Sequence, residues 1–239
     1  IIPSRLKAKR LPNKPLKLIN GKEMILHVYD LAKNSQIGDV LVVTPDKDIA
    51  ELIKRHGGNS FMSLSKHETG THTLLEGFKN FYSSEPNIII NLQGDMPNLD
   101  SSAIKKLSDY MKKNLCDVAT LASSIEAKEE LINQNIVKVI TSADIMKSGF
   151  SEALDFRRDL LNQEHKSIYH HIGIYAFTNK ALMRYVNLKR SKLEIERNLE
   201  QMRALENNMK IHVGYTASNP LSIDTNSDLE EIKKIMENK

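Results

Sequence analysis

The 239-residue sequence contains one cysteine, no tryptophan and few other aromatic residues, and these shortages exclude several classes of protein. The single cysteine, Cys116, excludes an internal disulfide framework and is typical of a reducing compartment. Because Cys116 begins an apolar run, we interpret it as a buried thiol rather than a nucleophile. The shortage of aromatic rings leaves little surface on which nucleic-acid bases could stack.

Long apolar segments and a large excess of one charge are also missing. No apolar run approaches the roughly 20 residues that a membrane-spanning helix needs, and no signal-peptide pattern is visible. The formal net charge is +4, and the 34 Lys and Arg residues are spread along the chain rather than gathered into a stripe. We therefore expect a cytoplasmic protein that neither enters a membrane nor binds nucleic acid. Because the sequence begins in what reads as a strand, we also expect a few upstream residues to be absent from it.

The most informative stretch is the basic segment, residues 1–16, IIPSRLKAKRLPNKPL. Its apolar start indicates the end of a β-strand, and five cations follow within ten residues. Like charges so close together repel one another, which favours an anionic partner, although a solvated surface loop is the alternative. Three prolines stiffen the segment, and a solvated tail does not need that. Arginine offers a planar fork to phosphate and lysine a compact charge, so a phosphate chain is the expected ligand.

Short apolar runs alternate with helical periodicity along most of the chain, which predicts an α/β fold with a mostly parallel sheet flanked by helices. After the first strand, the predicted strands are residues 16–19, 39–44, 59–62, 87–92, 117–122, 137–141, 168–177 and 210–216. The predicted helices are residues 22–33, 46–55, 74–81, 100–114, 180–186, 195–207 and 227–237. The dipeptide Asn20-Gly21 predicts a turn.

Residues 143–166 interrupt this alternation, because their periodicity is weak and their charge is dense. The long predicted strand at residues 168–177 follows directly. We interpret residues 143–177 as a small inserted lobe within one domain that spans residues 1–239. We expect this lobe to supply a dimer contact.

Two aspartates that follow short apolar runs are candidates for a metal site. Asp95 comes after the strongest predicted strand, and Asp224 precedes a helix that we expect to be capped by Asn226 or Ser227. Either aspartate alone reads more readily as a turn or cap residue. As a pair at equivalent strand ends they suit Mg²⁺, which takes one or two carboxylates and finds its other ligands in water and phosphate.

Three further stretches carry weaker signals. TGTHT, residues 69–73, places a glycine between hydroxyls before a helix, where N–H groups either bind a base or phosphate or simply belong to a capped start. In HHIGIYAF, residues 170–177, adjacent histidines point to opposite faces of a strand, so a zinc pair is not expected. In LEQMRAL, residues 199–205, Glu200 and Gln201 either line a pocket wall or face solvent beside a core stripe.

Nine stretches occur in a fixed order: IIPSR, KRLPNKPL, NGKEMILHV, TGT, LQGDMP, NIVKV, HHIGIYAF, LEQMRALEN and SIDTNSDLE. Together they resemble the 3-deoxy-manno-octulosonate cytidylyltransferases, or CMP-KDO synthetases, nearly end to end. The resemblance is poor only around residues 143–166. It implies a Rossmann-like nucleotide-diphospho-sugar transferase fold, a homodimer and Mg²⁺. The implied reaction joins CTP and a KDO-type sugar acid to give CMP-KDO and pyrophosphate, for lipopolysaccharide biosynthesis.

The same resemblance implies roles for individual residues. Those matching the triphosphate binders and the cytidine loop are Arg5, Arg10, Lys14, Gly70 and Thr71. The metal-binding carboxylates match Asp95 and Asp224, which with Lys14 are the expected catalytic residues. Residues matching the lining of the sugar side are Gln93, His171, Tyr175, Glu200 and Gln201.

The chain departs from the family pattern at four places. His72-Thr73 stand for an acidic residue and an arginine, Ser151-Glu152 for Ser-Arg, Thr178 for an arginine and Asn13 for a glycine. Glu152 would repel a sugar acid unless it is turned away, in which case we expect Arg157 or Arg158 to supply the cation. Two alternatives therefore stay open. One is a CMP-sugar-acid synthetase for another acid, such as 8-amino-KDO or one of the sialic- or pseudaminic-acid kind. The other is a degenerate paralogue that binds nucleotide without turnover.

Overall fold

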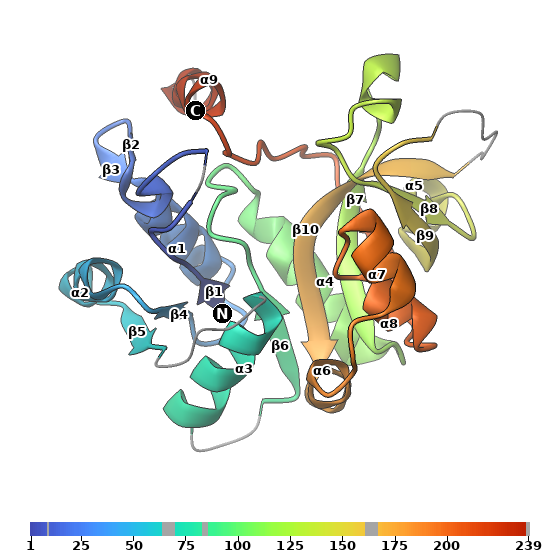
Figure 1. Cartoon of the computed structure of the whole chain (residues 1–239), viewed down its shortest axis with the longest axis horizontal. Coiled ribbons are helices and arrows are strands. Elements are labelled where there is room, and N and C mark those ends of the chain that lie inside the picture. The colour runs from blue at the N-terminus through green and yellow to red at the C-terminus, as the bar shows by residue number, and fades with distance from the viewer. Residues whose placement is uncertain (9, 64–69, 83–85, 161–166, 238–239) are drawn as a thin grey trace. The chain divides into compact units, whose positions relative to one another are not determined.

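The computed structural model of the chain describes residues 1–8, 10–63, 70–82, 86–160 and 167–237, without the side chains of residues 70 and 72 (Figure 1). Its strands are β1 Ile2–Pro3, β2 Leu18–Ile19, β3 Lys22–Glu23, β4 Leu41–Thr44, β5 Asn59–Met62, β6 Ile88–Asn91, β7 Val118–Ser123, β8 Lys138–Thr141, β9 Phe150–Arg157, β10 Ile168–Thr178 and β11 Ile211–Tyr215. Its helices are α1 Met24–Asn34, α2 Lys47–Arg55, α3 Gly70–Phe81, α4 Ser101–Lys113, α5 Ile145–Ser148, α6 Asn179–Val186, α7 Lys192–Arg197, α8 Met202–Glu206 and α9 Asn226–Glu237, with 3₁₀ turns η1 Lys14–Leu16 and η2 Lys128–Leu131.

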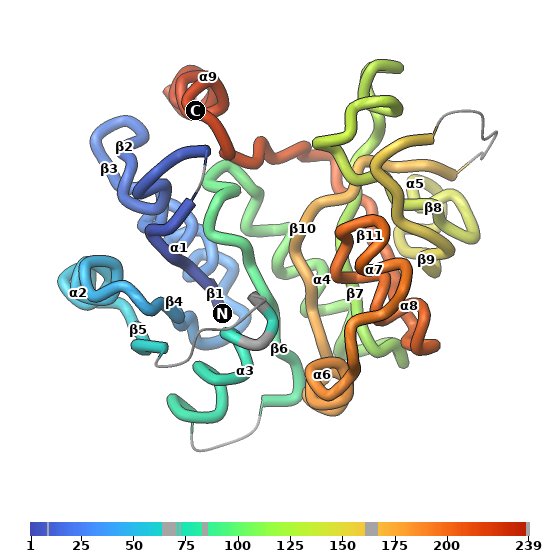
Figure 2. The backbone as a smooth tube through the Cα atoms, in the orientation of Figure 1, coloured from blue at the N-terminus to red at the C-terminus, as the bar shows by residue number. Residues whose placement is uncertain are grey.

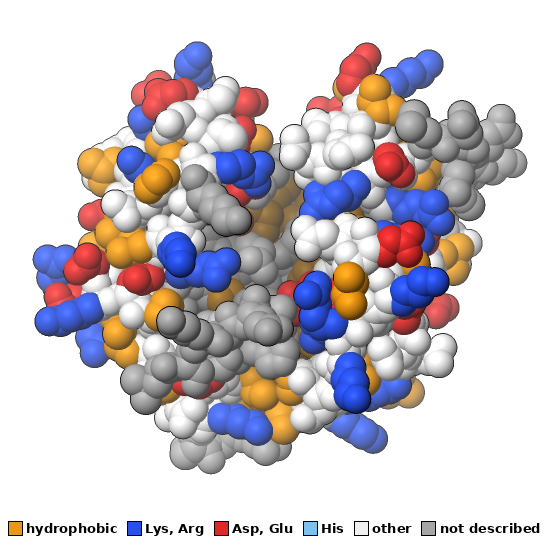
Figure 3. All heavy atoms as spheres, viewed as in Figure 1, with side chains coloured by type: hydrophobic (Ala, Val, Ile, Leu, Met, Phe, Trp, Pro, Cys, Tyr) orange, Lys and Arg blue, Asp and Glu red, His pale blue; other side chains and the backbone are white. Residues whose placement is uncertain are grey.

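The chain divides into two compact units, each built from segments that are far apart in the sequence. The first unit comprises Ile1–Glu85, Asn91–Lys106 and Pro220–Lys239, and the second comprises Pro86–Ile90 and Leu107–Asn219. Figure 2 shows how the C-terminal segment, coloured red, returns to the unit that contains the blue N-terminus. On the face drawn in Figure 3, basic and acidic side chains are interspersed over both units.

The first unit contains a three-stranded parallel sheet in the order β1-β4-β5. The four residues of β4 are all buried, as expected for a short apolar run covered on both faces. Helix α3 packs closely against this sheet through Gly77. A Cβ added at this glycine would come within 2.2 Å of the Val43 side chain, so a larger residue would not fit there. The predicted turn at Asn20-Gly21 is confirmed: both residues have positive φ, which suits the tight hairpin that joins β2 to β3.

The second unit is a six-stranded sheet in the order β6-β10-β7-β11-β9-β8. The α/β class is thus confirmed, but this sheet is mixed rather than mostly parallel. β11 runs parallel to β7, whereas the β10–β7, β10–β8, β11–β9 and β8–β9 pairs are antiparallel. β8 and β9 are antiparallel because the connection between them, through α5, is short. A parallel pair needs a crossover of a dozen or more residues.

The structure corrects two sequence predictions. Residues 143–166 contain a regular strand, β9, which lies between β11 and β8, and β9 and β10 belong to the six-stranded sheet. The single helix predicted over residues 195–207 is two helices, α7 and α8, because Asn198 adopts a left-handed conformation with φ of 52° and ends α7. Among the described helices, none combines the length and the apolar character needed to cross a membrane.

Candidate functional site

Lys14 lies between the two aspartates that the sequence singled out. Its Nζ is 2.9 Å from Asp95 Oδ2 and 3.1 Å from Asp224 Oδ1, and it donates a further hydrogen bond of 2.8 Å to the carbonyl oxygen of Ile223. Burial alone would lower the pKa of Lys14, but the charges and hydrogen bonds of the two aspartates outweigh it and raise that pKa. The ammonium group is therefore charged, and both carboxylates face one point in the first unit.

A backbone contact brings the two aspartates together. The N–H of Ile223 donates a hydrogen bond of 3.0 Å to the carbonyl oxygen of Asp95. The Ile223 side chain is fully buried in a small core, whose other members are Leu11, Ile19, Met24, Leu229 and Ile232. This core and the backbone contact hold Asp224, which precedes α9, beside Asp95, which follows β6.

Asp228 fixes the backbone of Asp224 from the first turn of α9. Its Oδ2 accepts hydrogen bonds of 2.8 Å from the N–H groups of both Asp224 and Thr225, while the Thr225 hydroxyl accepts one of 3.2 Å from the Asp228 N–H. This reciprocal pair is a capping box. The helix is therefore capped by Thr225, and the prediction of Asn226 or Ser227 as the cap was wrong. The spacing T-x-x-D in TNSD was the available signal.

The backbone of the basic segment is anchored at several points, although some of its cations are exposed. Leu11 is 2% exposed in the small core, and Leu6 N–H donates to Asp46 Oδ2 at 2.7 Å. Arg10 donates to Asp224 Oδ2 at 2.8 Å, whereas Arg5 is exposed. Asn13, which stands where the family pattern has glycine, has φ of 56°, and asparagine is among the few residues that tolerate this left-handed region.

The predicted cytidine-loop residues and Gln93 lie in the same unit as this cluster. Gly70 and Thr71 are the first residues of α3, and Thr71 is buried. Thr69, which precedes them in TGTHT, lies outside the described residues. Gln93 is half-buried, between β6 and Asp95.

Three of the predicted sugar-side residues, His171, Tyr175 and Glu200, come together in the second unit, where they are joined by a row of aromatic rings. The ring of His171 lies 5.5 Å from that of Tyr175, and its Nε2 is 3.0 Å from the Thr120 hydroxyl. The row continues through Phe177 to Tyr185, whose hydroxyl donates a hydrogen bond of 2.8 Å to the carbonyl oxygen of Glu200. Burial, with a smaller effect of His170, lowers the pKa of His171 to about 3.

Glu200 presents a buried acceptor at the end of this row. Its Oε1 has no hydrogen-bond partner among the described residues, although buried polar atoms normally have one. Nearby, Arg203 lies 5.0 Å from the Tyr185 ring and forms two hydrogen bonds, of 2.6 and 2.8 Å, with the buried carboxylate of Glu194. Gln201 is half-buried. Sequence reasoning had missed Glu194 and Arg203, since their pairing depends on the turn between α7 and α8.

Strand register places Glu152 on the opposite face of this sheet from His171. Ser151 pairs with Val213, which pairs with Thr120, so Ser151 shares the face on which Thr120 contacts His171. The next residue, Glu152, points to the other face, because side chains alternate along a strand. There it pairs with His212 and is exposed.

His212, beside Glu152, has its partners on this other face of the sheet, which helix α4 contacts through Tyr110. Its Nδ1 is 2.6 Å from the hydroxyl of Tyr110, a residue of α4, and the Tyr110 ring stacks on Phe150. Glu152 is therefore turned away from the row of predicted sugar-side residues.

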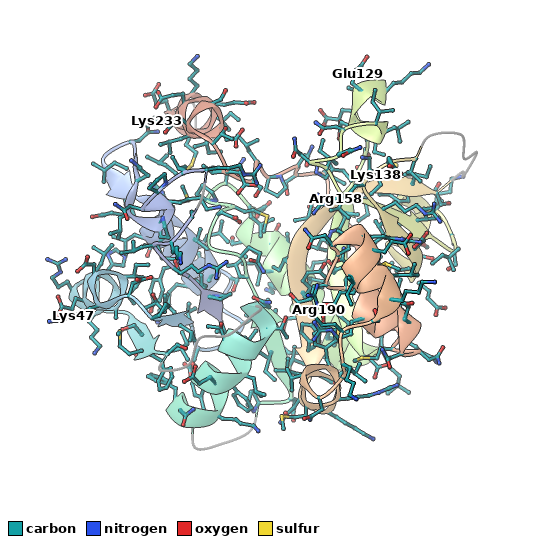
Figure 4. The ribbon with its side chains drawn as sticks, in the orientation of Figure 1. Lys47, Glu129, Lys138, Arg158, Arg190 and Lys233 are labelled. Atoms are coloured by element: carbon teal, nitrogen blue, oxygen red, sulfur yellow. The ribbon has the colours of Figure 1, made fainter. Side chains whose placement is uncertain are left out.

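The two arginines proposed to replace the lost cation have different partners. Arg157 Nε is 2.6 Å from Asp155 Oδ2, whereas the acceptor of Arg158 within the described part of the chain is a neutral group, the carbonyl oxygen of Gln134, at 2.9 Å. The carbonyl of Arg158 is in turn held by the buried ammonium of Lys138, which comes from β8 (Figure 4). Arg158 thus has a fixed backbone and a side chain without a carboxylate partner among the contacts described for it.

Thr178, where the family pattern has arginine, caps a helix instead. Its hydroxyl accepts a hydrogen bond of 3.1 Å from the N–H of Ala181 at the start of α6. A threonine in this position satisfies an N–H group that a helix start leaves unpaired.

Comparison with known proteins identifies the family of the chain. The sequence model of the family described as Cytidylyltransferase matches residues 1–211. The chain belongs to the cytidylyltransferase family. This family membership makes the chain a nucleotidyltransferase, and it confirms the resemblance inferred from the ordered stretches.

Similar relatives cover almost the whole chain. A 3-deoxy-manno-octulosonate cytidylyltransferase of Bartonella bacilliformis is 38% identical over 237 residues, which cover 99% of this chain and 97% of the relative. The enzyme of the same name from Brucella ovis is 37% identical over 234 residues, covering 98% and 93%.

Solved structures support the same fold. A CMP:2-keto-3-deoxy-manno-octonic acid synthetase complexed with CTP superposes with a TM-score of 0.89 at 32% identity, covering 99% of this chain and 97% of that one. A cytidylyltransferase from Leptospira borgpetersenii serovar Hardjo-bovis, at 18% identity and a TM-score of 0.63, shares the fold.

Proposed function

We propose that this cytidylyltransferase joins CTP to a KDO-type sugar acid, releasing pyrophosphate and forming CMP-KDO for lipopolysaccharide biosynthesis. The observation that carries the proposal is the charge cluster of Arg10, Lys14, Asp95 and Asp224, held together within one unit. The names of the relatives supply the sugar, and CTP is the ligand of the similar synthetase structure.

Phosphate binding falls to the basic segment. In the reaction, the anomeric hydroxyl of the sugar acid attacks the α-phosphorus, a new O–P bond forms, the bond to pyrophosphate breaks and the hydroxyl proton is lost. This displacement needs alignment and charge neutralisation more than a protein nucleophile. Arg5, Arg10 and Lys14 would hold the phosphates, and Leu11 keeps their backbone anchored while they do so.

Asp95 and Asp224 would hold Mg²⁺. The donor set fits this ion, since Mg²⁺ prefers oxygen ligands and uses one or two carboxylates together with phosphates and water. Both carboxylates already contact one cation, the Lys14 ammonium group. When bound, the metal would neutralise phosphate charge and lower the pKa of the attacking hydroxyl.

The predicted sugar-side residues offer matched partners for a polyhydroxy acid. Glu200 Oε1, which has no partner among the described residues, would accept a hydrogen bond from a sugar hydroxyl. His171 is neutral at pH 7, so it adds no charge of its own. In the same unit, Gln201 offers an amide and Tyr175 offers a hydroxyl. A cation for the sugar carboxylate comes from Arg158 or Arg157.

We also propose that the protein acts in the cytoplasm as a homodimer. Met146 and Leu154, in the segment expected to supply a dimer contact, are 57% and 58% exposed. Exposed large apolar side chains favour association when they gather in a patch. Light scattering on the wild-type protein and on Leu154→Lys tests this assembly, and a monomeric wild type would contradict it.

One assay tests the function. Purified protein is incubated with Mg²⁺, each nucleoside triphosphate in turn and a panel of sugar acids that includes KDO, 8-amino-KDO and a sialic acid, while pyrophosphate release is followed. We expect release with CTP and KDO. Release with another acid alone would reassign the sugar, and CTP binding without release from any acid would support the non-catalytic alternative.

A further inference from the structure

Cations of the chain already pair with both aspartates of the candidate metal site. Asp95 and Asp224 carry two negative charges, and Lys14 and Arg10 carry two positive ones. Arg10 contacts Asp224 through Oδ2, the oxygen that Lys14 does not contact, and its side chain is 57% exposed. Lys14 contacts both carboxylates, and its side chain is 16% exposed. Among the described residues, Lys14 is thus the cation that occupies the space between the aspartates.

A divalent ion and this ammonium group compete for the same oxygens. Mg²⁺ holds carboxylate oxygens at about 2.0–2.1 Å, whereas Lys14 Nζ is 2.9 and 3.1 Å from the two aspartate oxygens. A metal between the carboxylates would therefore displace Lys14. The ion would also repel the Lys14 ammonium group, because both are cations and a divalent ion repels it more strongly than a single charge does. Lys14 would leave only for another set of negative charges.

A nucleoside triphosphate brings such charges. The Lys14 side chain starts from η1, and its four-carbon stem allows the ammonium group to turn without moving the backbone. The carbonyl oxygen of Ile223, its third partner, is neutral and does not oppose the departure. Phosphate oxygens would replace all three of these hydrogen bonds.

We propose that Lys14 is a stand-in cation, so that the aspartate pair takes up a divalent ion only as its complex with a nucleoside triphosphate. This inference rests on the proposed function, because it assumes that the aspartates hold the metal. It adds that free metal is excluded, and that Lys14 changes partners from carboxylate to phosphate on binding.

The test measures metal binding rather than turnover. Mn²⁺, a paramagnetic substitute for Mg²⁺, is titrated without nucleotide into the wild-type protein, Lys14→Met and Lys17→Met, and free ion is counted by electron paramagnetic resonance. Lys17 is the matched control, a half-buried lysine three residues away. We expect Lys14→Met to bind Mn²⁺ about tenfold or more tightly than wild type, equivalent to about 1.4 kcal/mol or more. Lys17→Met should resemble wild type.

The same titrations with CTP present separate this inference from the proposed function. The wild-type protein should then bind Mn²⁺ with the nucleotide, and Lys14→Met should bind the complex more weakly. Equal affinity of wild type and Lys14→Met for free Mn²⁺ would overturn the stand-in role, even if the enzyme works. Absence of Mn²⁺ binding to every variant, with or without CTP, would instead overturn the metal site itself. Circular dichroism melts confirm that each variant is folded.

Discussion

The N–H of Ile223 donates a hydrogen bond of 3.0 Å to the carbonyl oxygen of Asp95, and this contact places the Asp224 carboxylate beside that of Asp95. The bond involves only backbone atoms, so it survives a change of either aspartate side chain. The position of the carboxylates and their charge can therefore be tested independently.

Removal of one charge should abolish catalysis and spare the fold. In Asp95→Asn and Asp224→Asn the size of the side chain is kept, but the metal and Lys14 lose a negative partner. We expect turnover to fall on the order of a hundredfold or more. The lost ion pairs are partly exposed, so the free energy of unfolding should change by less than about 1 kcal/mol. Pyrophosphate release and urea denaturation check the two expectations, and an active variant of either kind would remove that aspartate from the site.

The hydrogen bonds of Asp228 should matter for the rate as well as for stability. Asp228→Ala leaves the N–H groups of Asp224 and Thr225 without their acceptor, at a cost of about 1 kcal/mol in stability. We also expect a higher Mg²⁺ concentration for half-maximal rate, with Asp228→Asn intermediate. Ser227→Ala, an exposed position on the same turn, is the control. A purely structural cap would show lower stability with an unchanged Mg²⁺ requirement.

Loss of a phosphate-binding cation should weaken nucleotide binding. Lys14→Ala and Arg10→Ala each remove a charge-assisted contact, worth about 1.5–3 kcal/mol. Isothermal titration with CTP and Mg²⁺ measures the loss, and Lys17→Ala is the control. If both variants bound CTP as tightly as wild type, the basic segment would be a solvated surface despite its anchored backbone.

The sugar carboxylate should depend on the arginines at the end of β9. We expect the double variant Arg157→Ala/Arg158→Ala to raise the KM for KDO and to leave the KM for CTP unchanged. Arg158→Ala alone should account for most of the effect, because Arg157 is held by a carboxylate and Arg158 by a neutral carbonyl. Steady-state kinetics with each substrate varied in turn decides this. A double variant with a normal KM for KDO would assign the carboxylate to another group.

The buried His171 should make the fold sensitive to acid. Its pKa is about 3 in the folded chain and about 6.5 when unfolded, so between these values the unfolded chain binds the extra proton. The free energy of unfolding therefore keeps its full contribution from the neutral ring above pH 6.5. It decreases as the pH drops from 6.5 toward 3, by up to about 1.4 kcal/mol per pH unit.

Denaturation at pH 7 and pH 5 should show this loss in wild type and a smaller one in His171→Gln. The variant His27→Gln, a half-buried histidine of the other unit, serves as the control. An NMR signal of His171 that titrated near pH 6.5 would show that the ring is accessible to protons in the folded state.

The sequence by itself determined the features that depend on residues close together in the chain. The Asn20-Gly21 turn, the buried run of β4 and the stiff basic segment all follow from local backbone preference and periodicity. The α/β class follows from the alternation of such elements. For the same reason the two aspartates could be recognised as residues that follow apolar runs.

Tertiary structure alone decided which side chains meet. That Lys14 lies between Asp95 and Asp224 depends on the Ile223 contact and on a core assembled from two distant segments, residues 11–24 and 223–232, which periodicity does not encode. The direction of Glu152 depends on the register between β9 and β11, where a shift of one residue would turn it to the other face. The break at Asn198 allows α8 to turn back so that Arg203 reaches Glu194, because a left-handed residue ends a helix whose side-chain pattern would otherwise continue.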